Sequence, residues 1–321
     1  MRTVYLNGAF VPESEAKLSI YDLSVMQAAA AFEMTRSFGG VHFKLKEHLD
    51  RLHQSCKLLS IDMNDVSWGG YPEDIIKEVT ARNDHGPGEE HRLLIVVSPG
   101  AAPIYKEIAG TINHPFVYIA DFPLRFTVQG FSKYFTEGVH CVTSPIQQIP
   151  DACVPSQAKH RSRLHFHLAQ QQAPAGTWPL MAHAYWNYDG DEQLDYAEAP
   201  GANICFVRNG KVFTVDDHAL GGISLATVKE LIETEEASLP IATVGSIDVD
   251  ELWLTGTPFC MLPVVSLDGK PIGDGQIGPV YKETIRKWSD LVNCDFDRQI
   301  IAWDAQKIWT PHAQRLSATQ H

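Results

Sequence analysis

A stretch from Tyr196 to Glu233 brings an acidic residue close to an unusual helix start. Glu198 lies in a loop of small residues, and Gly221 and Gly222 precede a segment whose apolar residues recur at helical spacing. The spacing predicts a helix that begins near Ser224, a residue type that often caps helices. The free N–H groups of a first turn attract anions, and the helix dipole favours negative charge there. Two glycines before a helix are common in plain turns, so the motif indicates an anion site only together with others.

Lys159 is a second candidate for chemistry, because a lysine amine can act as a nucleophile and as a proton carrier. It ends a proline-marked loop, begins a predicted helix and precedes Glu198 by 39 residues. Its neighbours His160, Arg161 and Arg163 are basic. Positive neighbours and burial both lower the pKa of a lysine, so that more free amine is available near neutral pH. The same basic residues are typical of a solvated helix start, so Lys159 alone does not establish a site.

Two tight hairpins are predicted around these residues. Asn7-Gly8 and Asn209-Gly210 each lie between two apolar runs. Asn-Gly favours a type I′ hairpin turn, because both central residues of that turn need positive φ. The second hairpin lies between Glu198 and the helix predicted near Ser224, so strands are expected to position both ends of this stretch.

Helices are predicted on both sides of the chain's middle. One begins near Glu47, with Arg51 beside an apolar stripe. That stripe consists of Leu49, Leu52, Cys56 and Leu59. Another follows Lys159, with Leu164 and Leu168 four residues apart as its apolar contacts. From Asp295 onward no clean period is visible, so no helix is predicted there.

Composition limits the class of protein. The chain has 321 residues and 44% hydrophobic content, enough for two full-sized cores. Lys and Arg number 26 against 39 Asp and Glu, which gives a formal charge of −13. Such a balance argues against nucleic-acid partners and against binding to anionic membranes.

The six cysteines show no CxxC motif and no spacing typical of metal ligands. We therefore expect reduced, mostly buried thiols, no metal site, and a cytoplasmic protein. The N-terminus has no basic segment followed by an apolar core, so no signal peptide is predicted. The longest apolar run, Leu93 to Val97, is far too short to span a membrane.

In combination, these motifs resemble a known family. Glu198-x-x-x-x-Asn203, a hairpin, Gly222-Ile223-Ser224 and a helix form a pattern similar to that of the fold-type IV pyridoxal-phosphate enzymes. These include branched-chain and D-amino acid aminotransferases, R-selective amine transaminases and aminodeoxychorismate lyases. Further matches in the same order extend the resemblance over residues 1 to about 290. They are Phe32-Glu33-x-x-Arg36, Glu47-His48-x-x-Arg51-Leu52, Lys159 and Thr255-Gly256-Thr257.

The resemblance implies a role for each motif. Lys159 would form the Schiff base with pyridoxal 5′-phosphate and move the proton during catalysis. Glu198 would face the pyridine nitrogen and keep it protonated. The cofactor site as a whole would comprise Arg51, Glu198, Asn203, Gly222, Ile223, Ser224, Gly256 and Thr257. Within it, the phosphate would be anchored by Arg51, whose guanidinium binds phosphate as a fork, and by Ile223, Ser224 and Thr257.

The substrate is not decided by the resemblance. Gln27 stands where branched-chain enzymes carry a pocket tyrosine, and Arg163 stands near their second tyrosine, which we expect it to replace. Arg36 matches the aminotransferase pattern, and Arg92 resembles an arginine common to the family, although a strand-edge charge is an equal interpretation. The Arg-x-His trap of the D-amino acid enzymes is missing from residues 98–103.

We therefore expect an α/β (α+β) enzyme of two domains. Residues 1–121 would form a small N-terminal domain, 122–132 a linker, and 133–321 a large cofactor-binding domain with a barrel-like β core. The expected activity is amino transfer between an amino acid or amine and a 2-oxo acid, in a homodimer. The alternatives are a lyase that releases pyruvate from aminodeoxychorismate and a cofactor-free binding protein on the same scaffold.

Overall fold

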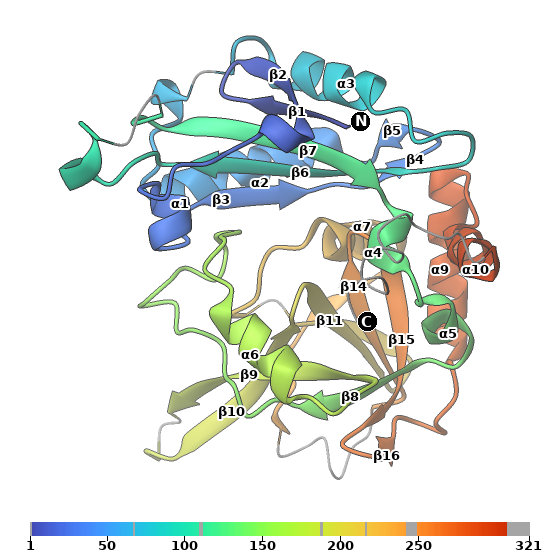
Figure 1. Cartoon of the computed structure of the whole chain (residues 1–321). Helices are drawn as coiled ribbons and strands as arrows, with labels where there is room; N and C mark the ends of the chain where they lie inside the picture. The colour runs from blue at the N-terminus through green and yellow to red at the C-terminus, as the bar shows by residue number, and fades with distance from the viewer. Residues whose placement is uncertain are drawn as a thin grey trace, which may run out of the picture.

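The computed structural model describes residues 2–66, 68–108, 112–186, 189–215, 217–241 and 249–306. The chain forms two main β-sheets, which lie one above the other in Figure 1, the N-terminal one uppermost. The first sheet has the strand order β2-β1-β7-β6-β3. Its strands are Thr3–Leu6 (β1), Ala9–Pro12 (β2), Ala31–Met34 (β3), His91–Ser98 (β6) and Phe116–Pro123 (β7).

Strand β6 shows how the first sheet packs. Leu93 and Ile95 lie in the core formed with helices α2 (Leu45–Leu58) and α3 (Pro72–Arg82). Val96 points to the opposite face, where Phe32 is buried with it. Two helices therefore cover one face of the sheet, and the helix predicted from Glu47 is confirmed as α2.

The predicted Asn-Gly hairpins are both present. Asn7 and Gly8 have φ angles of 45° and 92°, and Asn209 and Gly210 have 52° and 74°. These angles fit type I′ turns, in which both central residues have positive φ. They join β1 to β2 and β11 (Ala202–Arg208) to β12 (Lys211–Thr214).

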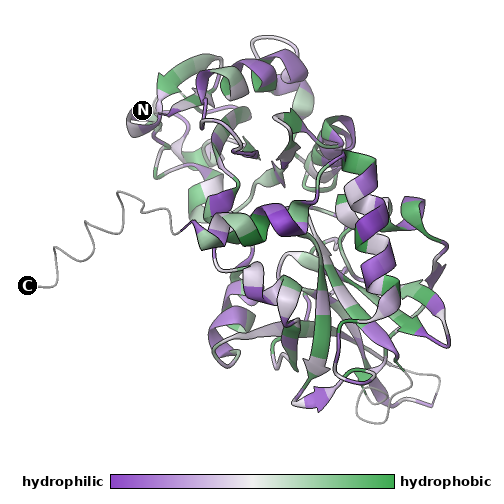
Figure 2. Cartoon of the chain, turned by 90° about the vertical axis from the view of Figure 1, so that its right-hand side faces the viewer, coloured by the Kyte–Doolittle hydropathy of each residue, from purple (hydrophilic) through white to green (hydrophobic). Residues whose placement is uncertain are grey.

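The second sheet closes on itself. Its order is β10-β9-β8-β15-β14-β11-β12-β13, and β10 also pairs with β11. The expected barrel-like core is confirmed, and the strands around it are mostly hydrophobic (Figure 2). The remaining bounds are Val139–Thr143 (β8), Thr177–Trp186 (β9), Glu192–Ala199 (β10), Glu235–Glu236 (β13), Glu251–Gly256 (β14), Cys260–Leu267 (β15) and Lys270–Pro271 (β16).

Helices cover the outside of the barrel. The helices α7 (Ile223–Leu231) and α9 (Pro279–Val292) pack against β14 through a core that contains Trp253 and Trp288. Helix α10 (Phe296–Ala305) follows, where the sequence predicted no helix. Its buried residues, Phe296, Ile300 and Trp303, are spaced at helical intervals, so the period is present but short. No helix of the described residues is both long and apolar enough to cross a membrane.

Helix α6 (Leu164–Gln172) corrects one prediction. The helix forms, but Leu164 and Leu168 are 67% and 39% exposed, and Phe166 and Ala169 are the buried residues. Leucines four residues apart share one helix face, whichever way that face points. In this chain that face points away from the barrel.

The first sheet ends at Pro123, and β8, the first strand of the second sheet, begins at Val139. Two short helices, Arg125–Val128 (α4) and Ser132–Thr136 (α5), connect them. The predicted limits at residues 121 and 133 remain a prediction. The other short elements are Glu13–Glu15 (η1), Leu23–Met26 (α1), Ser37–Phe38 (β4), Val41–His42 (β5), Met63–Asp65 (η2) and Pro103–Tyr105 (η3).

Candidate active site

A cleft of about 720 Å³, part of it open to solvent, lies where Arg51 of helix α2 faces the end of the barrel. Loop residues, the β10–β11 turn, the start of α7 and the end of β14 line it. All of the predicted catalytic and cofactor-binding residues lie in this lining: Arg51, Lys159, Glu198, Asn203, Gly222, Ile223, Ser224, Gly256 and Thr257. Residues far apart in the sequence are thus brought to one place.

Lys159 is fixed by its backbone to the N-terminal part of the chain. Its N–H donates to the Ser55 hydroxyl at 3.0 Å, and its carbonyl accepts from the Phe32 N–H at 3.0 Å. The Nζ atom lies 4.9 Å from the centre of the Phe32 ring. Burial and the nearby Arg51 guanidinium lower the pKa of Lys159 to about 7. A substantial fraction of free amine is therefore present at neutral pH.

Glu198 lies at the end of β10, paired with Asn203 across the turn to β11. Its carboxylate is buried and accepts hydrogen bonds from the Gln148 side-chain amide and, at 3.4 Å, from the Leu220 N–H. Burial raises the pKa of Glu198 above its ordinary value. A cationic N–H in the cleft would stabilise the charged form of this carboxylate. Gln148, in the proline-marked loop, was missed by the sequence analysis because no pattern distinguishes it.

Gly222 is required by a close contact and not by its backbone angle, since its φ is −73°. A Cβ atom there would lie 2.0 Å from Oδ1 of Asn203. Asn203 cannot move away freely, because its amide donates to the Leu220 carbonyl at 2.7 Å. Gly256 is similarly confined, because a Cβ atom there would lie 2.7 Å from the Phe259 ring.

The start of α7 is open toward the cleft. The helix begins at Ile223 with Gly222 as its N-cap, and no side chain of the described residues caps it. Ser224 is therefore in the first turn and is not the N-cap that the sequence predicted; glycine takes that place because the backbone is confined by Asn203. Thr255 lies near this turn in the lining, and its buried hydroxyl has no hydrogen-bond partner within the described part of the chain. The arrangement offers several donors to an anion.

Arg51 reaches the same place from α2. Its Nε and Nη2 donate to the Glu33 carboxylate at 2.6 and 2.9 Å, and its Nη1 donates to the Gly221 carbonyl at 2.8 Å. His48 also binds Glu33, at 2.7 Å. Burial alone would raise the pKa of Glu33, but its two basic partners, Arg51 and His48, hold that pKa well below its usual range. Glu33 was noted only as part of a motif; its role in orienting Arg51 was missed.

The four residues predicted to contact substrate lie outside the lining formed by the described residues. Arg36 is buried, donates to the Pro258 carbonyl at 3.1 Å and stacks on Phe38. Arg163 is nearest, with its guanidinium 4.5 Å from the centre of Phe166, a lining residue.

Arg92 is also buried, beside Met34, and burial together with Arg36 lowers its pKa to about 9. Gln27 has an exposed side chain, and its carbonyl accepts from the Ser162 hydroxyl at 3.5 Å. The substrate roles of all four residues remain predictions.

Comparison with known proteins identifies the family of the chain. A model of the family described as amino-transferase class IV matches residues 30–267. The chain is 28% identical over 302 residues to a putative branched-chain-amino-acid aminotransferase of Methanocaldococcus jannaschii, covering 90% of this chain and 96% of that protein. It is 24% identical over 310 residues to the D-alanine aminotransferase of Staphylococcus haemolyticus, covering 88% and 95%.

Solved structures share the fold. A branched-chain aminotransferase from Thermoproteus uzoniensis with norvaline has a TM-score of 0.72 and 23% identity, covering 94% of this chain and 98% of that one. The branched-chain amino acid aminotransferase from Escherichia coli has a TM-score of 0.72 and 22% identity, covering 91% and 94%. The resemblance to fold-type IV enzymes is confirmed. The chain belongs to the class IV aminotransferase family and is a pyridoxal-phosphate-dependent aminotransferase.

Proposed function

We propose that pyridoxal 5′-phosphate binds in this cleft, with Lys159 as the catalytic residue, and that the amino donor is an amino acid or amine and the acceptor a 2-oxo acid. The observation that carries the proposal is that Lys159, Glu198 and Arg51 line one cleft, where a lysine of lowered pKa and a carboxyl of raised pKa form an opposed pair. Such pairs are typical of acid–base sites. The named relatives are aminotransferases, which favours amino transfer over pyruvate release.

The residues present fit the cofactor's phosphate. The uncapped first turn of α7, the Ser224 side chain and the unpartnered Thr255 hydroxyl supply donors among the described residues. Arg51 supplies the positive charge, in an orientation that Glu33 fixes. Gly222 allows the Asn203 side chain to lie directly against the start of the helix, where a Cβ atom would clash with it. Ile223 and Thr257 complete the lining on this side.

When bound, pyridoxal phosphate supplies an electron-withdrawing ring that stabilises negative charge at the α-carbon of the amino substrate. Lys159 binds the cofactor and carries the proton to and from that carbon at Nζ, which its lowered pKa permits near neutral pH. Glu198 holds the proton on the ring nitrogen, and Gln148 and the Leu220 N–H orient its carboxylate. Asn203 and Gly256 shape the turn beside it.

The substrate side of the site is proposed to include Arg163, with Gln27, Arg36 and Arg92 as more distant members. Two neighbours in the lining support Arg163. Its guanidinium lies beside the Phe166 ring, and its Nη2 lies so near Gly201 that a Cβ atom at position 201 would be 3.8 Å away. Burial lowers the pKa of Arg163, although Glu198 opposes this effect. A partly desolvated guanidinium would bind a carboxylate more strongly than one in water.

We propose a homodimer for the native assembly. Exposed apolar residues gather on and beside α1 and η3. The N–H of Leu23 in α1 donates to the carbonyl of Gly100, just before η3, at 2.9 Å. The exposed apolar residues are Ile20, Val25, Met26, Ile104 and Ile108, with 46–81% of each exposed. A group of neighbouring exposed apolar residues fits a subunit contact. Six free cysteines support the cytoplasm as the compartment.

Borohydride reduction of the protein with bound pyridoxal phosphate, followed by peptide mapping, tests the cofactor proposal. We expect the label on Lys159, and no turnover of amino donors by Lys159→Ala. Lys57→Ala, which changes an exposed lysine on α2, is the matched control and should keep both the label on Lys159 and the turnover of amino donors. Label on another lysine, or wild-type turnover by Lys159→Ala, would refute the proposal. Offering D- and L-amino acids and R- and S-amines one at a time then identifies the donor class.

A further inference from the structure

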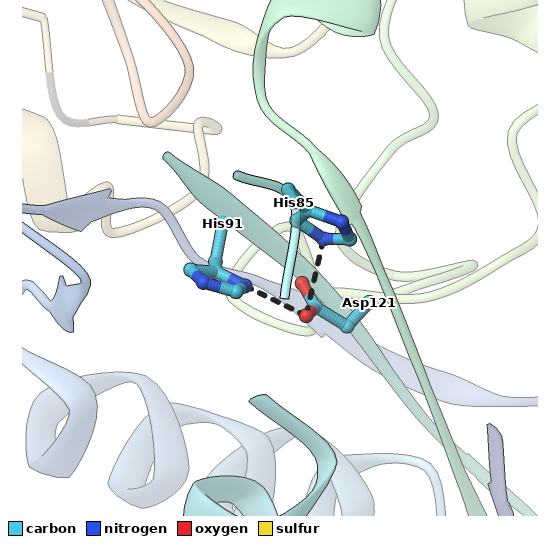
Figure 3. A group of neighbouring side chains, drawn as sticks. All are labelled: His85, His91 and Asp121. Carbon is cyan, nitrogen blue, oxygen red and sulfur yellow. Dashed lines mark hydrogen bonds and ion pairs between the residues drawn. The ribbon is translucent and has the colours of Figure 1, made fainter. Parts of the chain in front are cut away.

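A group of three potential metal ligands lies on the N-terminal sheet (Figure 3). His91 begins β6, Asp121 lies in β7, and His85 comes from the loop between α3 and β6. The ligand atoms of the three residues all lie within 4.8 Å of one another. The sequence analysis expected no metal site, because the spacing of the six cysteines is not typical of metal ligands.

The geometry is close to that of a zinc site. Zinc–nitrogen and zinc–oxygen bonds of about 2.0–2.1 Å in a tetrahedron separate neighbouring ligand atoms by roughly 3.3 Å. His85 Nε2 lies 3.3 Å from Asp121 Oδ2, which already matches. His91 Nδ1 lies 2.7 Å from the same oxygen and needs only a small outward movement. Two imidazoles and one carboxylate form a ligand set that suits zinc and its neighbours in the first transition row.

The group is buried and only partly satisfied by hydrogen bonds. The Asp121 side chain is fully buried, and those of His85 and His91 are 6% and 13% exposed. Within the described residues, Asp121 Oδ1 and His85 Nε2 have no hydrogen-bond partner. Buried polar atoms without partners are unfavourable, and a cation bound between the three residues would give His85 Nε2 a partner.

The other polar groups nearby have different roles. His42, whose ring is 6.1 Å from that of His91, binds Thr35 at 2.9 Å and Thr80 at 3.1 Å. Glu90 accepts hydrogen bonds from the side chain of Ser37 and the N–H groups of residues 39 and 40. Three protein ligands therefore remain for the metal, and water would occupy the other position.

The position excludes a role in the cleft. Val97 of β6 pairs with Ala31, which forms a bridge with His160 next to Lys159. His91 precedes Val97 by six residues, and a strand rises about 3.3 Å per residue, so the two ends are roughly 20 Å apart. A metal at His91 would be structural.

We propose that His85, His91 and Asp121 bind one divalent transition-metal ion of the zinc type. The ion joins the loop of residues 83–90 to β6 and β7, at the point where the chain leaves the first sheet. The loop contains Gly86 and Gly88 with positive φ, and it has little regular structure of its own. A cation that joins the loop to two strands stabilises the folded state, because the unfolded chain has no preformed site.

The test uses the untagged holoenzyme, freed of metal by chelation and titrated with Zn²⁺ by calorimetry. We expect one equivalent to bind and to raise the melting temperature. His85→Gln and Asp121→Asn should each weaken binding by more than about 100-fold, beyond the 10–100-fold effect of outer-shell changes. His85→Gln should disturb the fold less than Asp121→Asn, because His85 lies in a loop and Asp121 lies in β7.

His218→Gln is the matched control. His218 binds Asp151 at 2.7 Å, and its ring centre lies 3.4 Å from that of His183, so this second histidine group offers zinc the same kinds of ligand. We expect His218→Gln to leave the tight binding unchanged. The proposal is overturned if no zinc binds, or if His218→Gln abolishes the binding and folded His85→Gln retains it.

Discussion

Glu33 and Arg51 form a two-pronged ion pair, with Nε donating to Oε1 at 2.6 Å and Nη2 to Oε2 at 2.9 Å. The remaining nitrogen of Arg51 donates to the Gly221 carbonyl at 2.8 Å, next to the start of α7. A planar guanidinium bound on two edges has one orientation left. The first sheet therefore determines where positive charge lies in a cleft that the barrel mainly forms.

Glu33→Gln should destabilise the fold, because it leaves Arg51 without its buried counter-charge. Breaking a buried ion pair lowers the free energy of unfolding by about 3–5 kcal/mol. Because glutamine can keep part of the hydrogen bonding, we expect a loss of about 3 kcal/mol. Urea denaturation of the apoprotein measures this change in the free energy of unfolding. Glu78→Gln, which breaks the exposed pair with Arg82, should cost less than about 1 kcal/mol. Equal effects of the two substitutions would contradict a special role for Glu33.

The reactivity of Lys159 in the apoprotein should titrate near neutral pH. Its pKa is lowered to about 7, so the free amine fraction rises as pH rises through 7 and is complete well below the ordinary lysine value of about 10.4. An amine-selective reagent, followed by peptide mapping, gives the rate for each lysine. The Lys159 rate should level off above pH 8, whereas surface lysines continue to accelerate. A Lys159 rate that still rises beyond pH 9 would show that burial has less effect than inferred.

Local sequence signals predicted the local structure well. The turns at Asn7 and Asn209 could be predicted because an Asn-Gly pair by itself favours the two positive φ angles that a type I′ turn requires. The apolar stripe of α2 faces the sheet as expected. Glu198 lies at the end of a barrel strand, and Lys159 ends a loop that is hydrogen-bonded to Ser55 and Phe32, so the two motifs meet in the cleft.

Relationships between distant segments could not be predicted in the same way. Leu164 and Leu168 form an apolar pair, but only the packed structure reveals that they face outward. Gln148 binds Glu198 from 50 residues away, and nothing in its own surroundings marks it. The same is true of His85, which meets Asp121 only when the loop folds onto the sheet.

Gly222→Ala should reduce affinity for pyridoxal phosphate by at least tenfold. The new methyl group would lie 2.0 Å from Asn203 Oδ1, so either the start of α7 or Asn203 must shift. Overpacking of this kind costs about 1–3 kcal/mol. Gly70→Ala is the control, since its Cβ atom would be 3.8 Å from Ile75, an ordinary contact. Combining Gly222→Ala with Asn203→Ala should restore part of the affinity, and failure to do so would place the clash elsewhere.

Glu198→Gln should separate binding from catalysis. The phosphate donors are untouched, so affinity for the cofactor should fall only modestly. An amide cannot hold a proton on a ring nitrogen, and loss of one acid–base group lowers turnover by about 10²–10⁴-fold. Stopped-flow spectra of the bound cofactor, mixed with a saturating amino donor, measure the rate of the first half-reaction directly. Glu192→Gln, at the exposed start of the same strand, should leave that rate unchanged. If Glu198→Gln reacts as fast as the wild type, Glu198 does not face the ring nitrogen and another residue must do so.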